Sequence, residues 1–268
     1  MKIEDALPQI FTRTYPVLEP GTQMLLAVSL LRFHQIDALP IGFKARQKKR
    51  FAVFGYSCLK KLLQTDPEDY GKFLELPCEK ASQELSTIDM LEDIAALLRV
   101  FRKTKFGFTW VESNKLGGFA SLRDLLGLYG KKLISTDLTI GEVASSIFSL
   151  PPDTRIVAVL EEMFTRKFRR VFVDGRKTLV TDRRMIGYIF STSRIALAAK
   201  KPKSLLEIKL GEIDAVQPQF VPKNMSIGEA SEIMGKMTDE CLVCEKGVVT
   251  PWDLVMKPLA LGKLRIKK

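Results

Sequence analysis

The chain has 268 residues, 46% of them apolar and 27% charged, which is typical of a globular protein and excludes general disorder and collagen-like repetition. Its longest apolar stretches, near residues 24–31 and 94–98, are much shorter than the roughly 20 residues of a membrane-spanning helix. Acidic residues follow Met1 closely, where a secretory signal would be basic and then apolar. We therefore expect a cytoplasmic protein without a membrane span. Its net charge of +11 favours a polyanionic partner.

Four segments share one pattern, in which a short apolar strand leads through a hydroxyl residue into a short helix. The hydroxyl residues are Ser57, Ser121, Thr181 and Thr250, at spacings of 64, 60 and 69 residues. A helical stretch and a first strand precede each segment, so every unit is predicted as strand, helix, strand, strand, helix. A unit of this size cannot bury its own sheet, and neighbouring units should pack in pairs.

In chain order, the first helix of each unit is predicted over 22–33, 90–102, 154–164 and 226–237. The strand that follows it is predicted over 38–41, 107–111, 170–173 and 241–244. Two local signals support these ranges. Asp174-Gly175 is typical of a tight hairpin turn, and Ser226 with Glu229 forms a capping-box pattern at a helix start.

The repeat carries a resemblance to a known family. The period, the Leu39-Pro40-Ile41 strand ending and above all the segment from Gly247 through Thr250 to Asp253 resemble the CBS-domain family, named after cystathionine beta-synthase. The resemblance implies an α/β (α+β) fold of four tandem CBS repeats paired into two Bateman modules, as a flat disc or an elongated pair. The expected repeats are residues 1–64, 65–134, 135–204 and 205–268, the last with a basic C-terminal tail.

The most specific element of the resemblance is the motif G-x-x-[S/T]-x-x-D, complete in the second and fourth repeats. In the family, the hydroxyl holds phosphate and the Asp holds ribose, with AMP or ATP as possible ligand and no cofactor required. The same hydroxyl and Asp can serve only as helix caps, so both interpretations stay open. The candidate nucleotide-binding residues are Gly118, Ser121, Asp124, Gly247, Thr250 and Asp253.

The odd repeats depart from this motif and are basic. We align Phe54 and Lys60 with the Gly and Asp positions of repeat 1, and Thr178 and Arg184 with those of repeat 3. The four repeats have net charges of +6, −1, +6 and 0, so the excess charge belongs to the odd ones.

Clusters of Lys and Arg at two equivalent hairpins suggest contacts with the phosphates of structured RNA. The alternative is that they are ordinary solvated hairpins. The candidate RNA-binding residues are Lys44, Arg46, Lys48, Lys49, Arg50, Lys60, Arg166, Lys167, Arg169, Arg170, Arg176, Lys177 and Arg184.

Catalysis and metal binding are not expected. His34 is the only histidine, at a predicted helix end, and Cys241 and Cys244 lack a second ligand pair for zinc. No P-loop is present.

We therefore predict a non-enzymatic regulatory protein that binds structured RNA. By analogy with archaeal-type stand-alone CBS proteins, its partners would be ribosomal RNA and ribosomal proteins, and it would act as a translation-inhibiting hibernation factor, modulated by adenine nucleotide. The alternative is an adenine-nucleotide (AMP/ATP) sensor that regulates a protein partner. The chain would be a monomer or a homodimer through its modules.

Overall fold

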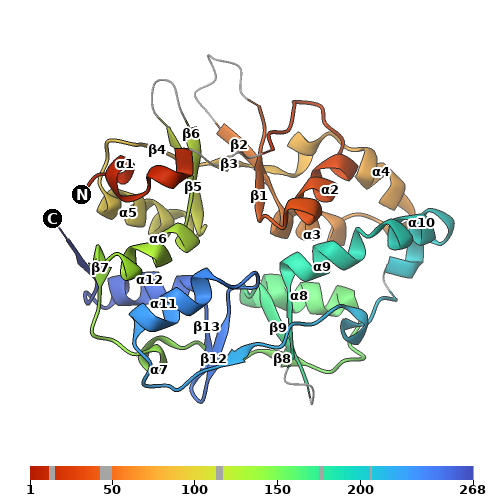
Figure 1. The fold of residues 1–268 in the computed structure, drawn as a ribbon. Helices are drawn as coiled ribbons and strands as arrows, with labels where there is room; N and C mark the ends of the chain where they lie inside the picture. Colours follow the sequence, from red (N-terminus) through yellow and green to blue (C-terminus); the bar gives the residue numbers. More distant parts are fainter. Residues whose placement is uncertain (12–15, 43–49, 113–116, 175–177, 206, 268) are drawn as a thin grey trace. The chain divides into compact units, whose positions relative to one another are not determined.

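The computed structural model describes residues 1–11, 16–42, 50–112, 117–174, 178–205 and 207–267 (Figure 1). The predicted element order is present in repeats 2, 3 and 4, and in each of them a parallel strand pair is followed by an antiparallel hairpin. In repeat 1, an isolated parallel bridge between Leu18 and Ile41 replaces the first strand. The Asp174-Gly175 turn lies partly outside the described residues.

The even repeats have these elements. Repeat 2 contains β4 (Thr87–Asp89), α5 (Ile94–Thr104), β5 (Phe108–Glu112), β6 (Gly117–Ser121) and α6 (Leu122–Gly130). Repeat 4 contains β11 (Gln219–Phe220), α11 (Ile227–Gly235), β12 (Leu242–Cys244), β13 (Gly247–Val249) and α12 (Pro251–Ala260). The predicted helices and strands of these repeats are confirmed, with shifts of a few residues at their ends.

The odd repeats have additional helices. Repeat 1 contains α2 (Met24–His34), β1 (Ala38–Pro40), β2 (Arg50–Phe54) and α3 (Gly55–Leu63). Beyond the predicted boundary at residue 64, α4 (Tyr70–Glu75) and a third strand, β3 (Ser82–Leu85), belong to the same unit, and β3 pairs with β2. Repeat 3 contains β8 (Ser149–Leu150), α8 (Ile156–Arg166), β9 (Arg170–Val173), β10 (Thr178–Thr181) and α9 (Asp182–Ile189), followed by α10 (Thr192–Lys200). The predicted strand over 170–173 is reproduced in full.

Helix α5 shows why these sequences form helices at these places. The side chain of Asp93 caps its start by accepting a hydrogen bond from the Ala96 backbone N–H at 2.6 Å. Ile94, Leu97 and Phe101 follow the helical spacing and are all buried. The helix ends where the next residue takes a left-handed conformation. The predicted cap at Ser226 is confirmed in the same way, since its hydroxyl accepts from the Glu229 N–H.

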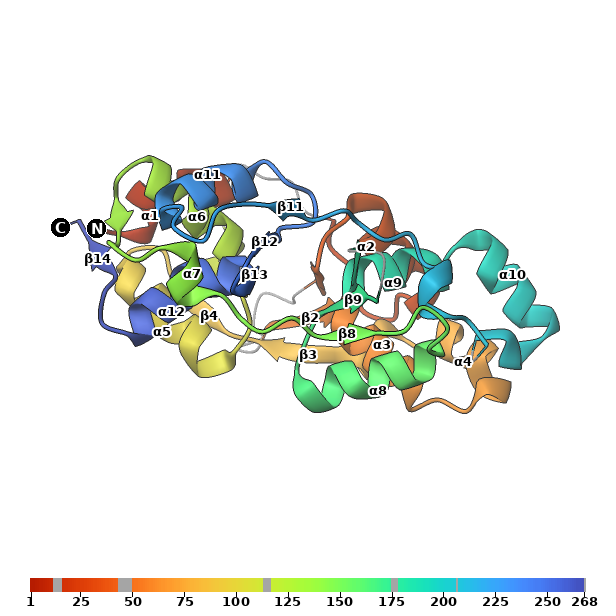
Figure 2. The same cartoon turned by 90° about the horizontal axis from the view of Figure 1, so that it is seen from below.

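The chain forms two compact units, and each combines alternate repeats. Unit 1 comprises residues 1–14, 86–147 and 218–268, with repeats 2 and 4; unit 2 comprises residues 15–85 and 148–217, with repeats 1 and 3. In unit 1, α6 packs against α11 and α12 (Figure 2). In unit 2, α3 packs against α8 and α9. The contacts inside each unit therefore join alternate repeats, and the pairing of neighbouring repeats stays a prediction.

Each unit has its own apolar core. In unit 1 the core includes Phe101, Leu125 and Leu254, and in unit 2 it includes Phe73 and Phe190. One buried side chain in unit 1 also links two repeats by a hydrogen bond, because the Tyr129 hydroxyl donates to the Leu254 carbonyl at 2.8 Å. Burial raises the pKa of this tyrosine.

Two short segments complete the even repeats. The N-terminal segment, with α1 (Ile3–Ala6) and a 3-10 turn (Pro8–Phe11), packs on α5 and β6, although the sequence assigns it to repeat 1. The segment with α7 (Ile140–Val143) packs in the same way on α12 and β13, and β7 (Ile134–Ser135) pairs with β14 (Arg265–Ile266). Burial of Ile3, Leu7 and Ile10 in the core of unit 1 explains why the N-terminal segment lies there.

These contacts predict opposite effects for two glycines of repeat 2. A Cβ at Gly118 would collide with the Ile10 carbonyl oxygen, whereas one at Gly127, within α6, meets nothing within 4 Å. Gly118→Ala should lower the free energy of unfolding by about 1–3 kcal/mol, and Gly127→Ala should raise it by about 0.5–1 kcal/mol. Denaturant unfolding of both variants measures the difference. Equal stability of the two would contradict the close approach at Gly118.

Candidate functional site

The motif of repeat 2 lies at the corner where β6 turns into α6. Ser121 is the N-cap residue of α6, and both its backbone N–H and its hydroxyl donate to Asp124 Oδ2, at 2.8 and 2.7 Å. Asp124 is only 4% exposed. The motif therefore forms a capping box, which confirms the cap interpretation of these residues without deciding whether they also bind a ligand.

An aromatic cluster lies beside this corner. Phe108, at the start of β5, is the register partner of Ser121 across the hairpin. Its ring stacks on Phe106 at a centroid distance of 6.0 Å and meets Phe119 edge-on at 6.2 Å, while Trp110 meets Phe119 edge-on at 5.3 Å. Phe106, Phe108 and Trp110 are half-buried. Repeat 2 thus places flat apolar rings next to a helix N-terminus.

The motif of repeat 4 has the same capping box and two further contacts. Thr250 donates to Asp253 Oδ2 from its backbone N–H and its hydroxyl, at 2.9 and 2.7 Å. Asp253 Oδ1 accepts from the Ser145 hydroxyl at 2.7 Å and lies 3.0 Å from Lys257 Nζ. Sequence reasoning missed both partners. Lys257 could have been found as an (i, i+4) ion-pair partner of Asp253, but no local pattern points to Ser145.

The motif glycines are explained by contacts within the chain. A Cβ at Gly118 would collide with the Ile10 carbonyl, and one at Gly247 would collide with the Ser145 carbonyl. Gly247 also has a φ of +142°, which strongly favours glycine. Both glycines therefore allow a neighbouring segment to approach the hairpin, a role that needs no ligand.

The alignment of repeat 1 must be corrected by three residues. Phe54 pairs with Ala38 at the start of the previous strand and is the N-cap residue of α3, as Ser121 pairs with Phe108 and is the N-cap residue of α6. Phe54 thus occupies the hydroxyl position and Ser57 the Asp position. Lys60 lies one helical turn further on, so it does not replace the motif Asp. The sequence aligns Ser57 with Ser121 because Ser57 also lies in an apolar segment that leads into a helix.

The alignment of repeat 3 agrees with the structure. Thr181 is the N-cap residue of α9 and accepts a hydrogen bond from the Arg184 backbone N–H at 3.2 Å. Arg184 therefore occupies the position of Asp124 and Asp253. Repeat 3 is the one repeat of the four with a cation there.

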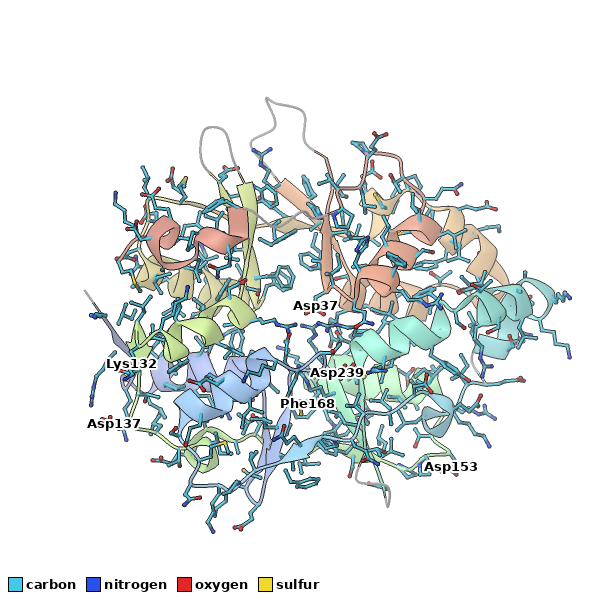
Figure 3. All side chains as sticks on the ribbon, in the orientation of Figure 1. Asp37, Lys132, Asp137, Asp153, Phe168 and Asp239 are labelled. Carbon is cyan, nitrogen blue, oxygen red and sulfur yellow. The ribbon has the colours of Figure 1, made fainter. Side chains whose placement is uncertain are left out.

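Unit 2 contains an ionic network near this corner. Asp37, labelled in Figure 3, immediately precedes β1, and its Oδ1 lies 3.2 Å from both Arg169 Nη2 and Arg183 Nη2. Arg169 Nε also donates to Asp182 Oδ2 at 2.7 Å. Burial alone would raise the pKa of Asp37, but the two guanidinium groups outweigh it and lower the pKa to about 2. The same carboxylates raise the pKa of Arg169 against the effect of burial.

Unit 1 has an ion pair equivalent to the Arg183–Asp37 pair of unit 2. Arg123, the second residue of α6, lies 3.0 Å from Glu240, which precedes the hairpin of repeat 4. Arg183 and Asp37 occupy the same positions in repeats 3 and 1. In both units, therefore, an Arg near the start of one repeat's second helix contacts the acid before the hairpin of the repeat packed against it.

The predicted RNA-binding residues have varied surroundings. Arg166 pairs with Glu162 at 2.6 Å and covers the Phe148 ring, so it and Arg169 have partners within the protein. Lys60 and Lys167 are exposed. The other described candidates, Arg50, Arg170 and Arg184, lie on β2, β9 and α9. The candidates outside the described residues are Lys44, Arg46, Lys48, Lys49, Arg176 and Lys177.

The structure places His34 at a helix end, as the sequence predicts. His34 is exposed as the last residue of α2, and Cys241 and Cys244 are buried. Among the described residues, no group of three His, Cys, Asp or Glu could hold a metal ion. Within the same part of the chain, no helix has the length and apolar character that crossing a membrane requires.

The network of Asp37 predicts a specific dependence on pH. Because its pKa is lower in the folded protein than in the unfolded chain, Asp37 stabilises the fold above about pH 4, and this contribution is lost as the pH falls toward 2. Asp37→Asn should cost about 1–2 kcal/mol at pH 7. The control is Asp153→Asn on the surface. The free energy of unfolding of wild type and of Asp37→Asn is measured from pH 7 to pH 2. The difference between them should shrink as the pH falls, and a difference that is constant with pH would contradict the assignment.

The comparisons with known proteins concern the fold. No protein-family model and no curated protein matches the sequence. Protein MJ1225 from Methanocaldococcus jannaschii, proposed as an archaeal homologue of g-AMPK, has a TM-score of 0.81 to this structure at 16% identity, covering 96% of this chain and 99% of that chain.

Two further structures are similar. An uncharacterised conserved protein from Pyrococcus horikoshii has a TM-score of 0.54 at 11% identity, covering 96% and 99% of the two chains. A CBS-domain protein from Agrobacterium tumefaciens, with a TM-score of 0.39 at 17% identity, covers 47% of this chain and 98% of its own. The whole-length match to MJ1225 confirms the predicted fold class: this chain has the α/β (α+β) fold of that protein, with four repeats of one strand and helix order.

Proposed function

We propose that this protein is a non-enzymatic regulator that senses an adenine nucleotide at the N-terminal end of α6 in repeat 2. The observation that carries the proposal is the position of Phe108, directly across the hairpin from the capping residue Ser121. A base can stack on an aromatic ring, and a phosphate is stabilised by the free N–H groups at a helix start. Asp124 lies in the first turn of the same helix, and we assign it to the ribose.

The other repeats are less suited to this role. Repeat 4 has Cys241 and Val243 at the register positions of Phe108 and Trp110, and its Asp253 already makes four contacts, with Thr250, Ser145 and Lys257. Repeats 1 and 3 lack the Asp altogether. The likeness to a protein proposed as an archaeal homologue of g-AMPK supports a regulatory role for the whole chain.

Binding of AMP should stabilise the protein. A ligand that binds only the folded state raises the free energy of unfolding by about 2.7 kcal/mol at 100 times its dissociation constant. Thermal melts with increasing AMP should show a shift that grows with the logarithm of concentration, and Ser121→Ala and Asp124→Asn should abolish it.

The matched control for this experiment is Ser226→Ala. This variant also removes a capping hydroxyl in unit 1, from the start of α11. Like Ser121→Ala, it should lower the free energy of unfolding by roughly 0.5–2 kcal/mol. It should keep the full response to AMP. A wild-type protein that shows no shift at millimolar AMP or ATP would reject the nucleotide proposal and leave the motif residues as helix caps.

Structured RNA is a second candidate ligand, favoured by the distribution of charge. Unit 2 brings the two basic repeats together, with 24 Lys and Arg against 16 Asp and Glu, a net charge of +8; unit 1 has 18 against 15, a net charge of +3. Phosphate contacts from such a surface need no sequence code. The ribosome as the particular partner, a hibernation role and the cytoplasmic location stay predictions.

RNA binding should depend steeply on salt. The logarithm of affinity for purified ribosomal subunits should fall linearly with the logarithm of salt concentration, by about 0.7–0.9 per phosphate neutralised. Replacing Lys48, Lys49 and Arg50 by Ala should flatten the slope. The control replaces three lysines of unit 1, Lys131, Lys236 and Lys246, with the same loss of charge. Equal slopes for the two variants would exclude the hairpin from the interface, and no binding at low salt would reject RNA.

A further inference from the structure

We propose that β14, the last strand of unit 1, binds an acidic peptide in extended conformation, which adds to the edge of the strand opposite β7. The sequence shows this segment as a basic tail, and neither of the functions proposed above uses it. The partner would be a protein, and its binding would need neither nucleotide nor RNA.

Strand β14 and its two flanking residues alternate between apolar and basic side chains. Leu264 and Ile266 pack against the core of unit 1. Lys263, Arg265 and Lys267 alternate with them and are exposed. Since a strand rises by about 3.3 Å per residue, the three cations are spaced roughly 6.6 Å apart along one line. An extended peptide beside the strand has its own alternate side chains at the same spacing.

One edge of β14 pairs with β7, and the other edge can accept a strand. The Lys267 N–H donates to the Leu133 carbonyl at 2.9 Å, so Lys267 and Arg265 direct their backbone groups toward β7. The backbone groups of Leu264 and Ile266 therefore point to the opposite edge. Among the residues that the structure describes, β7 is the only strand paired with β14. The opposite edge thus offers N–H donors and carbonyl acceptors to an added strand.

Basic side chains outnumber acidic ones around this edge. The cations are all exposed, and they are Lys131, Lys132, Lys263, Arg265 and Lys267. Asp137 pairs with Arg265, and Glu142 lies with both of them in the wall of a shallow pocket beside β14. Lys132 and Asp137 are labelled in Figure 3. These five cations and two acids leave an excess of three positive charges.

The cations determine which partner fits. A short edge rich in lysine resists pairing with a strand of its own charge, and a second copy of this chain would bring the same cations to the edge. An acidic strand is favoured instead, because opposite charges directly across a strand pair stabilise it. RNA could contact the cations through its phosphates, but its backbone cannot continue a ladder of peptide hydrogen bonds. The combination of a strand edge and a row of cations therefore favours an acidic peptide.

The test measures binding of a fluorescein-labelled peptide, acetyl-Glu-Val-Glu-Val-Glu-Val-Glu-amide, to the full chain by fluorescence anisotropy at low salt. Wild type should bind it. Lys263→Gln with Lys267→Gln should weaken binding about 2- to 30-fold, because each change removes one cross-strand charge pair. Arg265 is left in place because it pairs with Asp137. The matched control, Lys236→Gln with Lys246→Gln, removes two other exposed lysines of unit 1 and should bind like wild type.

Two modified peptides separate strand pairing from charge. When each Glu lies across from a cation, the valine N–H groups face β14 and the glutamate N–H groups face away. Methylation of the valine backbone nitrogens should therefore weaken binding about tenfold or more, although every charge is kept. Methylation of the glutamate nitrogens should leave binding unchanged. In the complex with the unmodified peptide, amide exchange of Leu264 and Ile266, followed by NMR, should be slower.

Several results would overturn the proposal. Equal binding of the two methylated peptides would mean that charge alone holds the peptide. Equal binding by the two double-lysine variants would place the contact elsewhere, and so would unchanged exchange of Leu264 and Ile266. Displacement of the peptide by a more tightly bound oligouridylate would identify a nucleic-acid site. Absence of binding to wild type would reject the peptide outright. AMP binding is measured independently, so the nucleotide function stands or falls separately.

Discussion

The shared core within each unit is the constraint on which the rest of the structure depends. A strand-helix-strand-strand-helix repeat has two helices whose apolar faces it cannot cover alone. In unit 1, α6 covers α11 and α12, and in unit 2, α3 covers α8 and α9. Because the second helix of each repeat contributes to this packing, the strand-to-helix corner that starts it is held in a defined position. The candidate site is built on that corner.

Within each unit, an ion pair at this corner also joins the two repeats. The pairs Arg123–Glu240 and Arg183–Asp37 are equivalent, and both join the start of a second helix to the repeat packed against it. An isolated exposed pair contributes little to stability. The pair in unit 2 belongs to a network with Arg169 and Asp182, which explains the low pKa of Asp37.

The four corners have the same backbone and different chemistry. Repeats 2 and 4 have an Asp in a capping box, repeat 3 has Arg184, and repeat 1 has Ser57. A carboxylate in the first turn of a helix is favoured by the helix dipole, and a cation there is not. The first turns of these helices therefore differ in charge from repeat to repeat. Repeats 1 and 3, which have the excess of Lys and Arg, lie together in unit 2.

The sequence alone determined the repeat, the order of its elements and the motifs of repeats 2 and 4, because periodicity and capping patterns are local properties of the chain. It misplaced repeat 1, where the structural equivalent of Ser121 is Phe54 and only the strand register reveals it. The packing of alternate repeats and the contacts of Asp253 with Ser145 were decided by the tertiary structure. Such contacts join residues more than 100 positions apart, and no local pattern encodes which distant segment will fill a given place in the core.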